Sequence, residues 1–77
     1  MNLIFDVGNT RIKVAVFEQN QCLRNSAYNC LQDWIDENWL QKHSISQAMV
    51  SSVSGNEDEI ITYLTLLKLP TLLFTNT

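Results

Sequence analysis

Residues suited to binding a phosphate and a metal ion lie close together near the start of the chain. They fall within the stretch Asp6-Val7-Gly8-Asn9-Thr10-Arg11-Ile12-Lys13. A glycine in a tight turn lets backbone N–H groups approach an anion closely. Thr10 adds a hydroxyl donor, Lys13 adds a point charge suited to phosphate, and Asp6 offers a hard oxygen ligand for hydrated Mg²⁺. These residue types at this spacing therefore favour a phosphate and metal site.

The same stretch predicts a β-hairpin. Leu3-Ile4-Phe5 before it is a continuous apolar run, typical of a central strand that is buried on both faces. The segment Ile12–Phe17 after it is rich in β-branched residues. Gly8-Asn9 is a two-residue hairpin signal, because both residues tolerate positive φ. We therefore expect two antiparallel strands joined by a two-residue loop.

This loop sets the register of the predicted hairpin. With Gly8 and Asn9 as the loop, Asp6 pairs with Arg11 and Ile4 pairs with Lys13. The carboxylate and the ammonium are then diagonal neighbours on one face of the sheet. The alternative is an ordinary hairpin, in which Asp6 and Asn9 only satisfy the turn backbone. Composition alone favours that alternative, because short motifs match many unrelated sequences.

Length, charge and cysteine content restrict the classes of function. The 77 residues are 45% hydrophobic, which predicts one small domain over residues 1–77. The net charge is −3, and the sequence contains no basic cluster. We therefore expect neither a nucleic acid nor a membrane as partner. Residues 1–5 are too short for a signal peptide, and no run approaches transmembrane length. Cys22 and Cys30 form no CxxC pair, which favours reduced thiols in a cytoplasmic protein.

Apolar periodicity predicts three strands followed by a helix. The strands span Asn2–Asp6, Thr10–Phe17 and Cys22–Tyr28, and the third alternates poorly, so we expect it at a sheet edge. Asn29 then resembles a helix N-cap, with Gln32 completing a capping box. The buried face of this helix comprises Leu31, Trp34, Ile35 and Trp39. The two tryptophans are expected in the core; the alternative is a partner surface or nucleotide stacking.

A strand, a helix and a last strand complete the chain. The apolar run Ala48–Val53 predicts a buried parallel strand. Its Ser51-Ser52 pair is equally compatible with contact to a phosphate and with a simple strand end. Asn56 starts the second helix as N-cap, with Glu59 as its capping-box partner. The buried stripe of this helix comprises Ile60, Ile61, Leu64 and Leu67, and Pro70 follows its end. Thr71–Thr75 is the final strand.

The order β-β-β-α-β-α-β predicts a ribonuclease-H-like α/β half domain. Three antiparallel strands form a meander, and two crossovers add parallel strands on the other side of the first strand. The result is a five-stranded mixed sheet of order 3-2-1-4-5. Asp6 then lies at the carboxyl end of the central strand, where open α/β sheets bind ligands. This agreement between element order and motif position favours the phosphate loop over the ordinary hairpin.

The N-terminal motif Asp-x-Gly-Asn-Thr-x-x-Lys resembles the first phosphate motif of type III pantothenate kinases. These enzymes belong to the superfamily of actin, hexokinase and heat-shock ATPases. The match covers Asp6, Gly8, Asn9, Thr10 and Lys13, and the later apolar strand, helix and strand are similar as well. The chain is several times shorter than the enzymes of the family. We therefore expect it to be their N-terminal part.

The resemblance implies an ATP-dependent transfer of phosphate to pantothenate, the first step of coenzyme A synthesis, by a homodimer. It implies Mg²⁺ and a monovalent cation such as K⁺ or NH4⁺ as cofactors. Gly8, Asn9 and Thr10 would cradle the phosphates, Lys13 would neutralise charge, and Asp6 would hold Mg²⁺ through water. The general-base Asp of the family lies in a Gly-x-Asp-Arg segment, which is expected beyond Thr77. No catalytic residue is thus expected within the chain, and we expect the 77 residues alone to be inactive.

Two other functions are compatible with the predicted fold. A nuclease would use Asp6 as its first metal ligand, but it needs a second acid near Ser51 and Ser52. A non-catalytic interaction or regulatory module would associate through apolar surface that a half domain leaves uncovered. The kinase ranks first because its motif match is the most specific.

Overall fold

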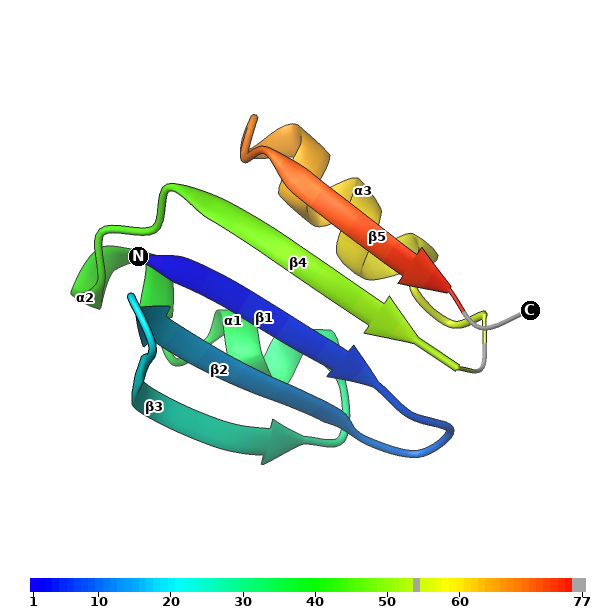
Figure 1. Cartoon of the computed structure of the whole chain (residues 1–77). Coiled ribbons are helices and arrows are strands. Elements are labelled where there is room, and N and C mark those ends of the chain that lie inside the picture. The colour runs from blue at the N-terminus through cyan, green and yellow to red at the C-terminus, as the bar shows by residue number, and fades with distance from the viewer. Residues whose placement is uncertain (54, 76–77) are drawn as a thin grey trace.

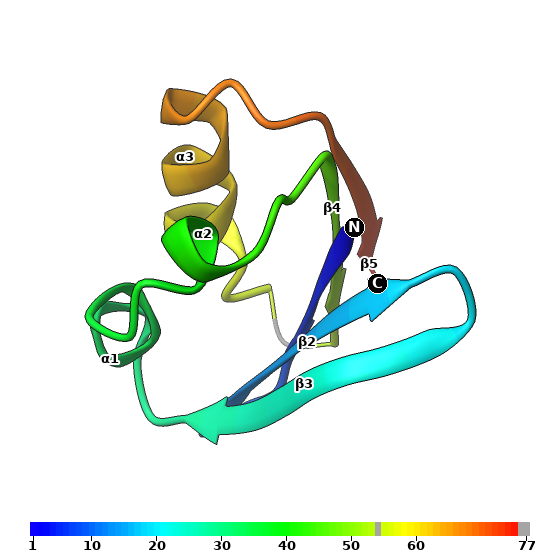
Figure 2. The same cartoon turned by 90° about the vertical axis from the view of Figure 1, so that its left-hand side faces the viewer.

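Five strands form one mixed sheet, and three short helices cover one of its faces (Figures 1 and 2). The computed structural model describes residues 1–53 and 55–75. The elements are β1 (Asn2–Val7), β2 (Ile12–Glu18), β3 (Gln21–Tyr28), α1 (Leu31–Ile35), α2 (Trp39–Lys42), β4 (Gln47–Ser52), α3 (Asp58–Leu66) and β5 (Thr71–Thr75).

The strand order is β3-β2-β1-β4-β5, as the element order predicts. β1 pairs antiparallel with β2 and β2 with β3, whereas the β1–β4 and β4–β5 pairs are parallel. β1 is therefore central, and β3 is an edge strand as predicted. A register shift between Val16 and Phe17 marks an irregularity in the β2–β3 ladder.

One prediction about β1 is wrong: the strand is buried on one face only. Leu3, Phe5 and Val7 are fully buried, whereas Ile4 is half-buried and Asp6 is exposed. The reason is that all three helices lie on the same side of the sheet (Figure 2). The other side, called here the open face, has no helix against it in the described part of the chain.

The core lies between the sheet and the helices. Trp34 and Trp39 are both 1% exposed, which confirms their predicted place in the core. The ring of Trp34 packs edge-on against Phe5, with the centroids 4.9 Å apart. α3 contributes Ile60 and Leu64 to the same core. Of the predicted stripe of α3, Ile61 is half-buried and Leu67 is exposed, since the helix ends at Leu66.

The first predicted helix is interrupted. Asn38 has a left-handed backbone with φ of 57°, so that α1 ends before it and α2 begins after it. Asparagine tolerates this conformation better than most residues. Both predicted N-caps are also wrong: the caps are Cys30 and Glu57, and neither makes a side-chain cap hydrogen bond.

No helix in residues 1–53 and 55–75 has both the length and the apolar character needed to cross a membrane.

Candidate functional site

Asp6 and Lys13 lie directly opposite one another on β1 and β2. The predicted register is therefore wrong by two residues, because Ile4 pairs with Ala15 rather than with Lys13. The observed register pairs Val7 with Ile12 and thus keeps apolar residues together on the covered face. A shift of two residues preserves the faces, so Asp6 and Lys13 still share the open face, and they are closer than predicted.

The loop between the strands has four residues, Gly8–Arg11, instead of two. The Gly8 N–H donates to the Arg11 carbonyl at 2.9 Å, which closes the loop. Residues of positive φ in the described chain are Gln19, Asn38, Lys68 and Gly55, so the loop uses no left-handed residue. A Cβ at Gly8 would lie 3.4 Å from the Arg11 carbonyl oxygen. Gly8 therefore needs no special φ here, and a Cβ at this position would lie at the border between a tight and an ordinary van der Waals contact.

The eight predicted site residues border two hollows, one on each side of the sheet. On the open face, a hollow of about 250 Å³ is lined by Asp6, Gly8, Asn9, Thr10, Arg11 and Lys13. On the covered side, a hollow of about 200 Å³ is lined by Val7, Ile12 and the same loop, together with residues 29–31, Asn56, Glu59 and Ile60. The loop thus forms the wall between two hollows, and Asp6 and Lys13 both line the hollow on the open face.

The Asp6 carboxylate and the Lys13 ammonium are available to a ligand. Both residues are exposed, and in the described part of the chain the one ion pair joins Arg24 to Glu37. A carboxylate and an ammonium beside a polar loop suit a hydrated Mg²⁺ and a phosphate, respectively. Residues 1–53 and 55–75 contain no group of three side chains that would hold a metal directly. A metal bound through water by Asp6 and by ligand oxygens fits this arrangement.

The two serines at the end of β4 lie on opposite faces. Ser51 pairs with Asp6 and is half-buried, so it lies beside Asp6 on the open face. Ser52 pairs with Val7 and is 2% exposed, and its Oγ has no hydrogen-bond partner among the residues that the structure describes. Of the pair, Ser51 alone lies on the same face as Asp6 and Lys13.

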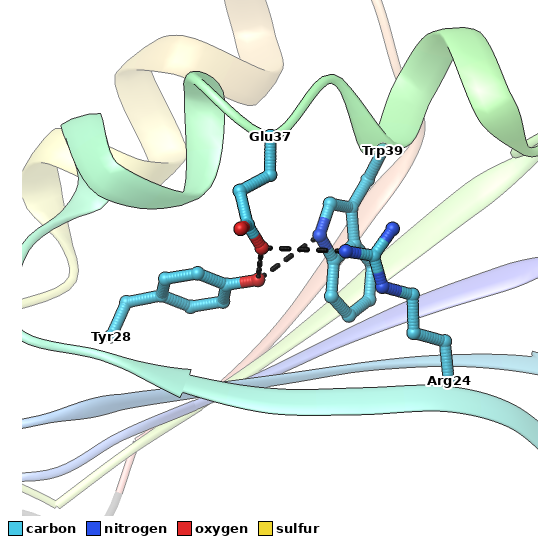
Figure 3. Close-up of polar contacts among 4 residues, drawn as sticks. All are labelled: Arg24, Tyr28, Glu37 and Trp39. Carbon is cyan, nitrogen blue, oxygen red and sulfur yellow. Dashed lines mark hydrogen bonds and ion pairs between the residues drawn. The ribbon is translucent and has the colours of Figure 1, made fainter.

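A cluster of four side chains holds β3 to the junction of α1 and α2 (Figure 3). The Tyr28 hydroxyl donates to the Glu37 carboxylate, and Arg24 pairs with the same oxygen at 3.3 Å. The indole N–H of Trp39 donates to the Tyr28 hydroxyl at 3.1 Å, and the Arg24 guanidinium stacks 4.1 Å from the Trp39 ring centre. Sequence reasoning missed this cluster, because its members meet through tertiary contacts and form no local motif.

The hydrogen bonds of this cluster shift two pKa values. The pKa of Glu37 is lowered, mainly because its carboxylate accepts the Tyr28 hydrogen bond. The pKa of Tyr28 is raised, mainly by burial and then by the same bond. The segment that follows Tyr28 lines the covered hollow, so the cluster also fixes one wall of that hollow.

Comparison with known proteins adds no family: no family model matches the chain, and no curated protein matches it.

Proposed function

We propose that the chain is the amino-terminal, ATP-phosphate-binding part of a cytoplasmic type III pantothenate kinase. The intact enzyme would transfer the γ-phosphoryl group of ATP to the primary hydroxyl of pantothenate. The direct pairing of Asp6 with Lys13 carries this proposal. It brings the two charged residues of the motif together beside the Gly8–Arg11 loop, at the carboxyl end of the central strand.

Each group of the hairpin has a distinct role in the proposed site. The Gly8 N–H already closes the loop, so the N–H groups of Asn9 and Thr10 and the Thr10 hydroxyl are the donors to phosphate oxygens. The Lys13 ammonium neutralises phosphate charge, and Asp6 orients Mg²⁺ through water. Mg²⁺ supplies charge neutralisation between the phosphates when it is bound, and phosphoryl transfer depends mainly on such positioning and charge stabilisation.

The remaining parts of the proposed reaction lie outside the hairpin. The general base, the pantothenate pocket and the monovalent-cation site would come from residues beyond Thr77. The 77 residues alone should therefore turn over no substrate. Pantothenate-dependent formation of ADP by the purified 77-residue chain would contradict this part of the proposal.

Titration with ATP·Mg²⁺, followed by amide NMR, tests the phosphate site. We expect shifts at Asn9 and Thr10 at millimolar nucleotide, and we expect Lys13→Ala to abolish them. Lys42→Ala is the matched control, because Lys42 lies in the last turn of α2 and lines neither hollow. Asp6→Asn should abolish the difference between the amide shifts that ATP induces and those that ATP·Mg²⁺ induces. Unmoved loop signals in the wild-type protein would refute the site.

The two rival functions differ in how well the open face suits them. A two-metal nuclease needs a second acid beside Asp6, but its neighbour on β4 is Ser51. An interaction module is favoured by one specific observation, the apolar residues exposed along β5. That surface is compatible with the kinase as well, since it lies two strands away from β1.

A further inference from the structure

We propose that the outer side of the helical layer binds an amphipathic α-helix of a partner protein, and that the last turn of this partner helix is basic. The binding surface, called here the helical groove, runs between α3 on one side and α1 and α2 on the other. Figure 2 shows the three helices together on one side of the sheet. The inference goes beyond the proposed phosphate site and does not depend on it.

The helical groove consists of two hollows that share part of their lining. One hollow, of about 450 Å³, lies between α1 and α3, and the other, of about 300 Å³, reaches from α3 to α2. Ile35 and Tyr63 line both hollows, which therefore join into one groove. Further apolar side chains of the lining are those of Leu31, Leu40, Leu66 and Leu67.

α3 carries more apolar surface than its contact with the sheet uses. Ile60 and Leu64 lie four residues apart and are buried in the core. Tyr63 and Leu66 in α3 and Leu67 at its C-cap form a second stripe, which lines the helical groove. Leu66 is 76% exposed and Leu67 is 44% exposed. Apolar side chains that adjoin in this way and remain in water indicate a surface for a partner.

A helix suits this groove better than an extended segment does. The walls of the groove are helices, whose backbone groups bond within the helix and offer no free row for a strand to pair with. An extended segment would therefore lay its own backbone against apolar side chains without hydrogen-bond partners, whereas a helix satisfies its backbone internally. α3 has nine residues and is thus about 14 Å long, so the contact covers roughly two to three turns of the partner helix.

Charge indicates the chemistry and the direction of the partner helix. Asp58 and Glu59 line the groove at the start of α3, and none of the described residues that line it is basic. A partner with Lys or Arg opposite these carboxylates would pair with them. Basic side chains stabilise the last turn of a helix, so that turn belongs beside Asp58 and the partner runs antiparallel to α3. The same carboxylates and the net charge of −3 disfavour an anionic membrane surface as the occupant.

A synthetic helical peptide tests the proposal against the full chain by amide NMR. The peptide has about 16 residues, with leucines at positions i, i+4 and i+7 and a pair of arginines in its last turn. We expect shifts at Tyr63 and Leu66, with a dissociation constant on the order of 100 μM because the contact is small. Leu66→Lys should weaken binding at least roughly tenfold. Leu72→Lys is the matched control, because Leu72 is an exposed leucine on the open face, and it should leave the affinity unchanged.

Charge variants test the direction of the peptide. Asp58→Asn removes one carboxylate of the groove and should weaken binding about threefold. Asp33→Asn is its control, because Asp33 lies in the first turn of α1 and outside the lining of the groove. Asp58 is chosen over Glu59 because Glu59 also lines the covered hollow beside the Gly8–Arg11 loop. A peptide with its arginines moved to the first turn should bind about threefold more weakly as well.

A proline in the middle of the peptide tests the helical conformation and should abolish binding. The proposal would be overturned by unmoved signals at Tyr63 and Leu66 at about 1 mM peptide, or by equal binding of the proline peptide. A loss of binding in Leu72→Lys but not in Leu66→Lys would place the peptide on the open face and overturn it as well. Shifts at the same residues that depend on protein concentration without peptide would assign the groove to a second copy of the chain, with the same consequence.

Discussion

Replacing Ser52 with alanine should stabilise the protein. The side chain lies at the end of β4, beside Val7 on the covered face, and is 2% exposed. Its Oγ has no hydrogen-bond partner among residues 1–53 and 55–75, so folding removes the hydroxyl from water without compensation from that part of the chain. A buried group left unsatisfied in this way costs about 1–3 kcal/mol. Alanine removes that cost and leaves a space the size of one oxygen atom, so we expect a net gain of about 1 kcal/mol.

Urea and thermal unfolding measure this gain. For a domain of this size, 1 kcal/mol corresponds to a rise in Tm of roughly 4–8 °C. Trp34 and Trp39 are buried, so their fluorescence reports the transition. Ser51→Ala is the matched control, with the same change on the same strand but the opposite face, and its effect should stay within about 0.5 kcal/mol. If Ser52→Ala lowered stability by 1 kcal/mol or more, the hydroxyl would have a partner in solution, and the reasoning would be refuted.

Three further predictions concern the Tyr28 cluster and the break between α1 and α2. Tyr28→Phe removes the acceptor of the buried Trp39 indole N–H and should cost about 1 kcal/mol in urea unfolding; unchanged stability would mean that the bond contributes nothing. The lowered pKa of Glu37 means that its contribution is present above the ordinary value of 4.5 and is lost as pH falls through the folded-state pKa. Glu37→Gln should therefore flatten the dependence of the free energy of unfolding on pH as the pH falls below the ordinary carboxyl value of 4.5, and an unaltered slope would contradict the linkage. Asn38→Ala should cost about 1 kcal/mol because φ is 57°, whereas Asn38→Gly should not; equal effects would exclude backbone strain as the cause.

The sequence predicts the order of the strands, because its element order implies a meander of three antiparallel strands and two crossovers to the other side of the first strand. It does not predict the length of the hairpin loop. Registers that differ by two residues place the same side chains on the same faces, so alternation cannot separate a Gly8-Asn9 loop from the observed Gly8–Arg11 loop. The pairing of Val7 with Ile12 distinguishes the two loops, and this apolar contact is seen only in the folded structure.

The helices show a different limit of sequence reasoning. The spacing of Trp34 and Trp39 correctly predicts burial, yet the helix between them breaks at Asn38. The neighbouring Glu37 is held by Tyr28 and Arg24 of β3, a long-range contact that no local pattern contains. The assignment of the candidate site to the stretch Asp6–Lys13 stays a prediction. The division of this stretch between two sides of the sheet follows from the helices covering one face only.

The pairing of β1 on both sides has a consequence for how the candidate site forms. Its β2 partner is joined through a short hairpin, whereas β4 brings Gln47 beside Asn2, across a separation of 45 residues. Contacts close in sequence form faster than distant ones, because less chain entropy is lost in closing a short loop. We therefore expect Asp6, the loop and Lys13 to meet early, in the meander of β1, β2 and β3. Ser51 joins them only when β4 pairs with β1. We therefore expect the two sides of the site to form at different stages of folding.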